Sequence, residues 1–346
     1  MTAEYTFYNP ADCTVSATLV FPFGAVPDYG YLYDTQAETR ILNADTEKYD
    51  ININGEPVEK KLRHTLTYFG SQFELSKDMA LLHDEFMEDD FYYPDMPVTR
   101  YTYIPEGVDT ETYDAANAAF VLSADAAKTR VLMENQNGGK LLDNAVQLEG
   151  WVKSGEFIVN VIGEPLSQMP QWKFYENGAC ENEIEGSMVL KDMEVTTLKD
   201  FALIAYDKNS GVSEADWYNA IIESIKNMEW SNGAISASAF QFDVSHHLMR
   251  WYEYVMTLDG GERIVNTVTA PIYPSFDMNY EPTIYEYTYL LSPAKSWKSF
   301  GTLDIVVNTP YYMTESGSEG FERTEMGYSC HLTGLPEGEL TFTLCS

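Results

Sequence analysis

Two of the five histidines in this chain, His246 and His247, stand side by side, close to the Trp-Tyr pair at 251–252. Adjacent imidazoles can ligate a metal or act as acid and base, provided that both rings face the same side. Residues 239–258 alternate in the manner of a β-strand, which points successive side chains to opposite faces. We therefore expect the pair to be structural, unless a bulge near 245–250 brings the two rings together.

A second candidate for chemistry is a group of aromatic residues in the C-terminal third. Tyr285, Tyr287 and Tyr289 alternate along one predicted strand and therefore share a face, and Trp297 follows shortly after. If exposed, these rings would stack on sugar rings or on a partner protein, and Trp251 is a further candidate for such a surface. If packed beneath a second sheet, the same row is ordinary core. With 25 tyrosines in the chain, we favour core over a ligand-binding surface.

The acidic run His83–Asp90 is a candidate cation site. Asp84 and Glu88 are one helical turn apart, a spacing at which two carboxylates can share Ca²⁺ with a neighbouring carbonyl. The run lacks the spacing of an EF-hand calcium loop, and runs of like charge usually form a solvated face. We therefore expect no cofactor, with Ca²⁺ at Asp84 and Glu88 as the alternative.

The recurrent catalytic motifs are missing from the sequence. The chain holds no G-x-G-x-x-G, no P-loop, no G-x-S-x-G and no H-E-x-x-H pattern. Cys330 and His331 are neighbours in a predicted strand, which aims their side chains apart. Among 54 acidic residues some pair always has the separation of a glycosidase, but no pattern singles one out.

The chain has four cysteines with no C-x-x-C pair among them: Cys13, Cys180, Cys330 and Cys345. Cys330 and Cys345 flank the turn GLPEGE, and a hairpin there would place them on neighbouring strands. In the simplest register Cys345 faces Tyr328, so a disulfide needs a register shift of two residues. We expect buried free thiols, with disulfide bonding as the alternative.

The charge balance is strongly acidic, with 54 Asp and Glu residues against 21 Lys and Arg and a formal net charge of -33. Such a surface repels phosphate backbones and anionic lipid surfaces, which argues against nucleic-acid binding. No apolar run approaches the roughly 18 residues that a membrane span needs. We expect an extracellular or cell-surface protein with its signal peptide removed, a tether beyond Ser346, and a protein or glycan partner.

Most of the 346 residues have the pattern of short strands. Two stretches have helical spacing instead, residues 76–88 and residues 213–229, each with a serine at its start as the N-cap. We therefore predict a mainly β protein of two β-rich, sandwich-like domains. The first covers 1–232 and includes both helices, and the second, 235–346, is an antiparallel β-sandwich.

Two glycine-containing stretches predict tight turns between strands. Asn54-Gly55 has the residue types that accept positive φ in a two-residue hairpin. Asn137-Gly138-Gly139 predicts a second turn between two strands in the same way.

Four stretches resemble a known group of proteins. They are FYNPADCTVSATLVFPFG near the N-terminus, the Leu-Asp-Gly-Gly-Glu turn at 258–262, the Tyr-Leu-Leu-Ser-Pro strand end at 289–293, and LPEGELTF at 335–342. In these stretches the chain resembles uncharacterised β-sandwich ectodomains of secreted or membrane-anchored proteins from Gram-positive bacteria. The resemblance implies export and brings no assigned catalytic residues.

Our hypothesis for function is a non-catalytic surface scaffold or adhesion protein. It is motivated by the β pattern, the acidic surface and the missing catalytic motifs. The alternative is a carbohydrate-binding or carbohydrate-active extracellular protein that uses the aromatic rows.

Overall fold

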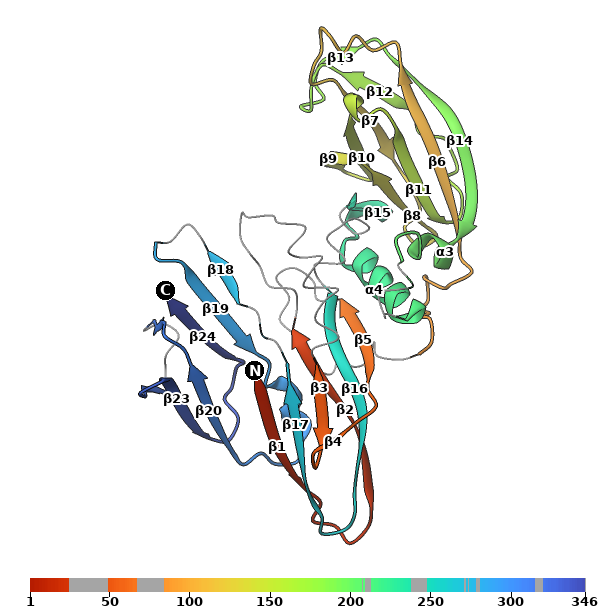
Figure 1. Ribbon diagram of the computed structural model, residues 1–346. Helices are drawn as coiled ribbons and strands as arrows, with labels where there is room; N and C mark the ends of the chain where they lie inside the picture. The colour runs from red at the N-terminus through yellow and green to blue at the C-terminus, as the bar shows by residue number, and fades with distance from the viewer. Residues whose placement is uncertain are drawn as a thin grey trace. The chain divides into compact units, whose positions relative to one another are not determined.

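The chain is mostly β-strand, as predicted, with few and short helices (Figure 1). It divides into two compact units, of which the first joins Met1–Leu82 to His247–Ser346 and the second is His83–His246. The second unit is therefore an insertion within the first, and this division differs from the one expected near 232–235. The computed structural model describes residues 1–24, 49–66, 84–206, 208, 213–237, 248–270, 272, 274–277, 281–314 and 320–345.

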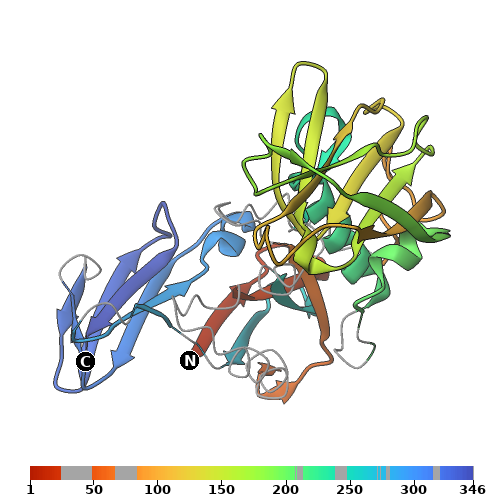
Figure 2. The same ribbon diagram turned by 90° about the horizontal axis from the view of Figure 1, so that it is seen from above.

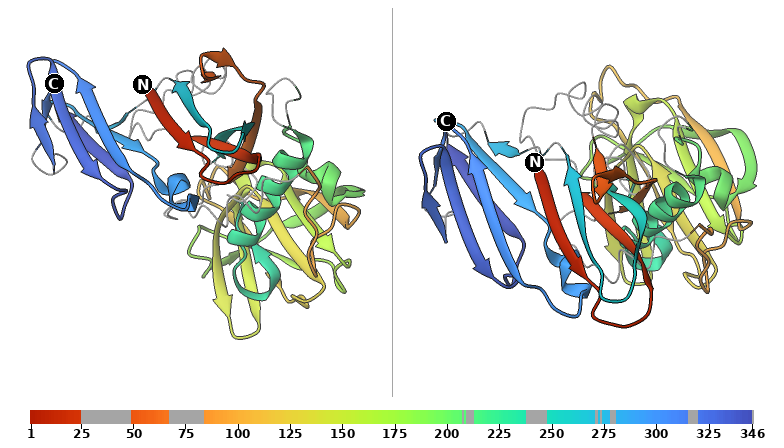
Figure 3. Two further views of the ribbon diagram at one scale, coloured as in Figure 1. Left: turned by 90° about the horizontal axis from the view of Figure 1, so that it is seen from below. Right: turned by 60° about the horizontal axis from the view of Figure 1, so that its bottom comes forward.

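Pairing between distant strands explains the difference in division. Strand β1 (Thr2–Tyr8) pairs antiparallel with β17 (Arg263–Thr269), and the two run side by side as red and cyan ribbons (Figures 1 and 3). In the same way β2 (Val15–Gly24) pairs with β16 (Leu248–Leu258). An alternating pattern locates a strand and its buried face, but it does not say which strand lies beside it. The N-terminal strands were therefore grouped with residues up to 232, although β1 and β2 pair with strands that follow that boundary.

The first unit contains what we call the N-terminal sandwich. One of its sheets has the strand order β1-β17-β3-β4, with β3 (Asp50–Ile53) and β4 (Glu56–Pro57). The other has the order β2-β16-β5, with β5 (Lys61–Leu66). Their inward residues form one core: Leu19, Phe21, Tyr49, Ile51, Tyr252, Tyr254, Met256, Leu258, Ile264, Val268 and Ala270.

Local turn chemistry is confirmed at one of the two predicted turns. Asn54 and Gly55 join β3 to β4 with φ of 51° and 86°, the positive values that a tight hairpin requires. The turn predicted at Asn137-Gly138-Gly139 is wrong, because these residues lie inside strand β9 (Gln136–Leu142). The left-handed residue before that strand is Asn135, with φ of 60°.

The first unit also contains the C-terminal sandwich, whose strands are seen from above as blue arrows in Figure 2. The aromatic rings of Phe321 and Phe342 meet between its two sheets with centroids 5.9 Å apart. The hairpin expected between Cys330 and Cys345 does not form, because their strands belong to different sheets. All four cysteines are free, as expected, but only Cys330 is buried, and the expected burial is wrong for the exposed Cys13. One sheet is β18 (Ser275–Asp277), β19 (Ile284–Tyr289), β24 (Leu340–Cys345) and β21 (Tyr312–Met313), and the other is β20 (Thr302–Asn308), β23 (Gly327–Thr333) and β22 (Phe321–Arg323).

The second unit is built on the inserted sandwich, which has two five-stranded sheets. We call them the β7 sheet and the β6 sheet. The β7 sheet has the order β13 (Glu183–Ile184), β12 (Trp172–Tyr175), β7 (Asn117–Leu122), β10 (Ala145–Trp151) and β9. The β6 sheet has the order β14 (Ser187–Thr197), β6 (Pro97–Glu106), β11 (Phe157–Gly163), β8 (Thr129–Glu134) and β15 (Ala234–Ile235).

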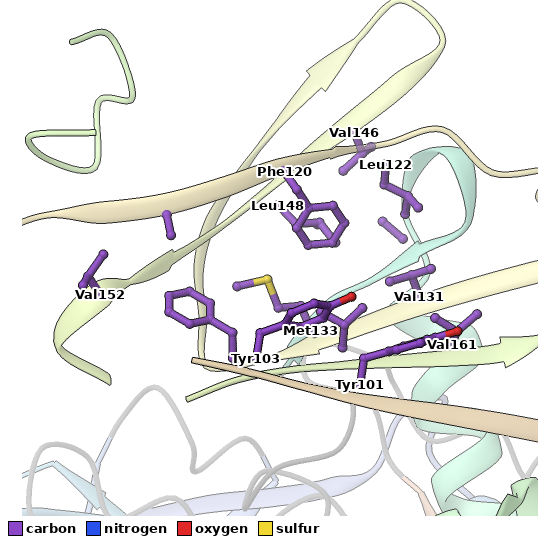
Figure 4. Packing of buried hydrophobic residues seen from close by; sticks show 14 of the residues in the cluster. Tyr101, Tyr103, Phe120, Leu122, Val131, Met133, Val146, Leu148, Val152 and Val161 are labelled. Atoms are coloured by element: carbon purple, nitrogen blue, oxygen red, sulfur yellow. The ribbon is translucent and has the colours of Figure 1, made fainter. Parts of the chain in front are cut away.

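The core of the inserted sandwich lies between these two sheets. Alternate residues of each strand point inward, as the period of two in a strand requires. Trp172 is the meeting point of several rings, with centroids 4.7 Å from Phe120, 5.2 Å from Phe157 and 5.5 Å from Tyr103. Figure 4 shows the packing, with Phe120, Leu122, Val146 and Leu148 from the β7 sheet facing Tyr101, Tyr103, Val131, Met133 and Val161 from the β6 sheet.

The helix predicted over 213–229 is confirmed as α4 (Glu214–Asn227). The side chain of Ser213 caps it by accepting the backbone N–H of Asp216 at 3.0 Å. It contacts the short helix α3 (Leu198–Ala202), which follows β14. The helix predicted over 76–88 lies largely outside the described residues, and its last part, 84–88, is not helical. None of the described helices has both the length and the apolar composition that a bilayer span requires.

Candidate functional site

The tyrosine row of β19 lies on the inner face of its sheet. In the antiparallel pairing of β19 with β24, Tyr285 is opposite Leu344. Tyr287 is opposite Phe342 in the same ladder. Leu344 and Phe342 are buried, and residues paired across a ladder share a face. The row is therefore turned toward the core of the C-terminal sandwich, which is the core arrangement favoured for it.

The first two tyrosines of the row each stack on another ring of the chain. Tyr285 and Tyr311 have ring centroids 5.9 Å apart and planes only 7° from parallel. Tyr287 and Phe342 are 5.2 Å apart with planes 12° from parallel. Burial raises the pKa of the Tyr287 phenol, which keeps this group neutral near neutral pH. Both rings thus have an internal partner on one face.

Tyr289 connects the β18-β19-β24-β21 sheet to the N-terminal sandwich. Its hydroxyl group shares a hydrogen bond with the hydroxyl of Tyr5, and its ring centroid is 6.3 Å from that of Phe21. Burial raises the pKa of both phenols. Two protonated, buried hydroxyl groups are good hydrogen-bonding partners, so this contact stabilises the packing and offers no open ring to a ligand.

The two tryptophans that the sequence grouped with the row pack against other partners. Trp297 contacts Phe7, with ring centroids 4.6 Å apart, and remains 38% exposed. Trp251 is fully buried on the face of β16 that points away from the N-terminal core. It lies opposite Arg63 in the ladder, whose Nη1 is 3.1 Å from Oε2 of Glu253. The structure does not gather Trp251 with the tyrosine row.

The exposed rings of the C-terminal sandwich are instead those of Tyr311 and Tyr312, which are 43% and 62% exposed. Tyr311 rests on Tyr285, and the guanidinium carbon of Arg323 is 5.1 Å from the centre of the Tyr312 ring. Ring faces open to solvent can stack on sugar rings or on partner side chains. This pair was not predicted from the sequence, although two adjacent tyrosines after Pro310 were a visible signal.

A second group of chemically capable side chains, which we call the thiol cluster, lies on the β7 sheet. Sγ of Cys180 is 3.5 Å from Nδ2 of Asn117. Oδ1 of Asn117 accepts a hydrogen bond from Nδ2 of Asn137 at 2.9 Å. Glu149 completes the cluster beside Cys180, and its Oε1 accepts from Nε2 of Gln147 at 2.8 Å.

The local structure explains how the thiol reaches this face. On β10, residues 146 and 148 face the core, so Glu149 faces outward with Asn117 of β7. Cys180 belongs to the turn after β12 and has a left-handed φ of 52°. In that turn Oδ1 of Asn177 accepts the N–H of Ala179 at 2.9 Å, which orders the loop over the sheet. The members are far apart in sequence, so no motif predicted them.

The environment of Cys180 opposes thiolate formation. Burial raises the pKa of the thiol, and this outweighs the lowering by the Asn117 amide, while the Glu149 carboxylate raises the pKa further. A cysteine acts as a nucleophile or metal ligand through its thiolate. The sulfur of Cys180 therefore stays protonated within a chain of hydrogen bonds. This indicates that the thiol cluster stabilises the fold and does not act as a nucleophile or metal ligand.

The acidic run places Asp84 and Glu88 in exposed, non-helical positions. The predicted one-turn spacing on a helix is therefore wrong for these two carboxylates. Within the described part of the chain, no three His, Cys, Asp or Glu side chains come together in a way that could hold a metal ion. The expectation of no cofactor stays a prediction, with Ca²⁺ at Asp84 and Glu88 as its alternative.

Asp89, also in the acidic run, is held by several partners. Its Oδ1 accepts the backbone N–H groups of Phe91 and Tyr92 at 2.9 and 2.7 Å, and its Oδ2 is 3.1 Å from Nζ of Lys226 on α4. Burial acts to raise the pKa of Asp89, but these N–H groups and the ammonium together lower it. Asp89 therefore links the segment before β6 to helix α4.

The adjacent histidines His246 and His247 lie outside the described residues. The strand that follows them, β16, shifts register against β2 between Arg250 and Trp251, at the end of the range where we expected a bulge. The pair's own geometry therefore stays a prediction.

The cysteine–histidine neighbours in β23 point apart, as expected. Cys330 is buried in the sandwich, whereas His331 is exposed and its Nδ1 is 2.6 Å from Oδ1 of Asp304. A catalytic dyad needs the two groups within hydrogen-bond reach of each other, and these side chains lie on opposite faces of one strand.

Comparison with known proteins gives no match to a protein-family model, to a curated protein or to a solved structure. The resemblance to Gram-positive ectodomains therefore stays a prediction. Function has to be inferred from the geometry of the side chains described above.

Proposed function

We propose that this chain is a non-catalytic scaffold or adhesion protein, exported to the cell surface or the extracellular space, whose sandwiches display a binding surface. One observation carries the proposal. Among the described residues, the candidates for ligand binding or catalysis discussed above include side chains that have partners within their own unit, as in the stacking of Tyr287 on Phe342 and the protonated thiol of Cys180. Such groups stabilise the sheets. We therefore assign the binding function to residues on the exposed surface.

The charge of the chain narrows the partner class. With a formal net charge of -33, the surface repels anionic polymers and favours neutral or basic partners. A protein or a neutral glycan fits this surface, and a nucleic acid does not.

Carbohydrate binding is the second candidate function, and the exposed pair Tyr311 and Tyr312 favours it. Tyr311 is held flat against Tyr285, so its outer face is a pre-positioned stacking platform. Arg323 beside Tyr312 adds donors that could hydrogen-bond sugar hydroxyl groups. This alternative uses neighbours of the predicted row instead of Tyr287 and Tyr289.

An array of purified extracellular proteins and glycans, read first by binding and then by mass spectrometry of each bound spot, tests both candidates. Retention on at least one spot, with the mass of the retained molecule unchanged, is the result we expect for a scaffold. Retention nowhere, or a change in the mass of any spot, contradicts the proposal.

Matched tyrosine variants decide between the two candidates. If a glycan is bound, the change Tyr312→Ala should weaken its binding at least tenfold under the carbohydrate alternative. Tyr8→Ala is the control, because Tyr8 is 50% exposed and lies 4.4 Å from the guanidinium of Arg263, a similar cation–π pair. Equal binding by both variants removes the alternative.

A further inference from the structure

Strand β14 is a long, open edge of the β6 sheet. It is 11 residues long, and in the described part of the chain only β6 pairs with it. Figure 1 shows it as the green ribbon at the outer side of its sheet. An edge strand presents unpaired N–H and C=O groups that can bind another strand.

The side chains of this edge are unusually apolar for exposed positions. Val189, Leu190, Met193 and Val195 are 42%, 43%, 57% and 63% exposed. In the ladder with β6, Leu190 and Met193 lie opposite core residues, so they share the inner face of the sheet. Met188, on the same face, packs partly against the core, but at Leu190 and Met193 the inner face of β14 is apolar and largely uncovered, which marks an interaction surface.

A bulge in β14 determines which register a second strand can adopt. The pairing with β6 shifts between Leu190 and Asp192, so Lys191 is the extra residue and lies beside Asp192 on the outer face. The ion pair of Lys191 with Glu156, at 2.8 Å, agrees with that outward placement. The inner face then carries Leu190 and Met193, and the outer face carries Lys191 and Asp192 between them.

We propose that a second copy of this chain pairs antiparallel with β14, about a two-fold axis between Lys191 and Asp192. Residues paired across an antiparallel ladder share a face, and a two-fold axis perpendicular to the sheet preserves the faces. In an unbroken strand this axis would pair inner with outer residues. The extra residue of the bulge shifts the alternation by one position. Residues paired about this axis therefore share a face of the sheet along the whole strand.

The resulting pairs are complementary. Lys191 of each copy lies opposite Asp192 of the other, which gives two ion pairs at the axis. Leu190 of each copy lies opposite Met193 of the other, and Met188 opposite Val195, on the apolar inner face. Each exposed apolar group of the inner face thus acquires an apolar neighbour, which is the stabilising unit of a sheet.

Three features oppose the pairing and define its conditions. Nζ of Lys191 already pairs with Oε1 of Glu156 at 2.8 Å, and the ammonium group must share or leave this carboxylate to meet Asp192 of the second copy. Oδ1 of Asp192 accepts the N–H of Met193 at 2.9 Å and must release it. The net charge of -33 on each chain repels a second copy, so the dimer needs enough salt to screen long-range repulsion. The proposal is independent of the proposed function, because it concerns the edge of one sheet and not a ligand.

Charge reversal tests the register. We expect the full chain at about 0.15 M salt to form a dimer by light scattering with size-exclusion chromatography, and Lys191→Asp or Asp192→Lys to raise its dissociation constant about tenfold or more. The double variant Lys191→Asp with Asp192→Lys should recover the dimer, because opposite charges again meet at the axis. Lys128→Asp is the control, since the Lys128–Glu164 pair lies on another strand end.

Two results overturn the proposal. One is a wild-type chain that stays monomeric at about 0.3 mM, well above the micromolar constants of weak specific complexes. The other is a double variant that associates as weakly as either single variant. As a second measurement, in a chain with the exposed free Cys13 replaced by serine, Leu190→Cys with Met193→Cys should give a disulfide between positions 190 and 193 of two copies, identified by peptide mapping after oxidation. Leu190→Cys alone should give no 190–190 disulfide, because position 190 does not face itself.

Discussion

Replacing Phe157 with alanine is expected to lower the free energy of unfolding of the inserted sandwich by about 3–5 kcal/mol. Phe157 is fully buried, and its ring centroid is 5.2 Å from that of Trp172. Removing the ring takes apolar surface out of the core and leaves a cavity among rigid strands, which cannot collapse to fill it. Urea unfolding followed by tryptophan fluorescence measures the change.

Val121→Ala is the matched control for this variant. Val121 belongs to β7 of the same sandwich but is 51% exposed on the outer face, so its loss should change stability by less than about 0.5–1 kcal/mol. A Phe157→Ala variant that loses less than about 1 kcal/mol would show that the two sheets do not close on this core.

Replacing Gly327 with alanine is expected to disrupt the β20-β23-β22 sheet of the C-terminal sandwich and to lower the free energy of unfolding by about 3 kcal/mol. Gly327 begins β23 with φ of 150°, a backbone conformation that other residues rarely adopt. A Cβ there would overlap the carbonyl oxygen of Val307 and lie 3.0 Å from the backbone N of Thr309. Both atoms are backbone, so the β20–β23 pairing itself must yield. A thermal melt followed by circular dichroism reports the loss.

Gly338→Ala is the control for this backbone effect. A Cβ at Gly338 meets no atom within 4 Å, and the residue lies in the same sandwich. We expect no loss of stability from it, because removing a glycine restricts the unfolded chain. Equal melting temperatures for the two variants would mean that the tight approach at Gly327 does not exist in solution.

The features that depend on neighbouring residues could be predicted from the sequence. Ser213 and the apolar face of the following residues were enough to identify α4, and Asn54-Gly55 was enough to identify a hairpin. Each is specified by contacts within a few residues, where the chemistry of caps and turns acts.

Features that depend on distant partners were not predicted. The pairing of β1 with β17 and the separation of β23 from β24 are choices among many alternating strands. The prediction of a turn at Asn137-Gly138-Gly139 was wrong because glycine occurs both in turns and inside strands, and the local sequence does not distinguish the two. The thiol cluster around Cys180 combines residues of β7, β9, β10 and the turn after β12. Their spacing in the sequence follows no motif, so the cluster could not be predicted.

Tyrosine nitration of the folded chain near pH 8, mapped by mass spectrometry, tests most directly whether the aromatic row is packing and not an open site. We predict fast nitration of Tyr312 and Tyr8, which are 62% and 50% exposed. Nitration of Tyr287 and Tyr289 should be slow, because both rings pack against neighbours and burial raises the pKa of both phenols. If the folded chain nitrates Tyr287 and Tyr289 as fast as Tyr312, the row is open to ligands and the scaffold account is contradicted.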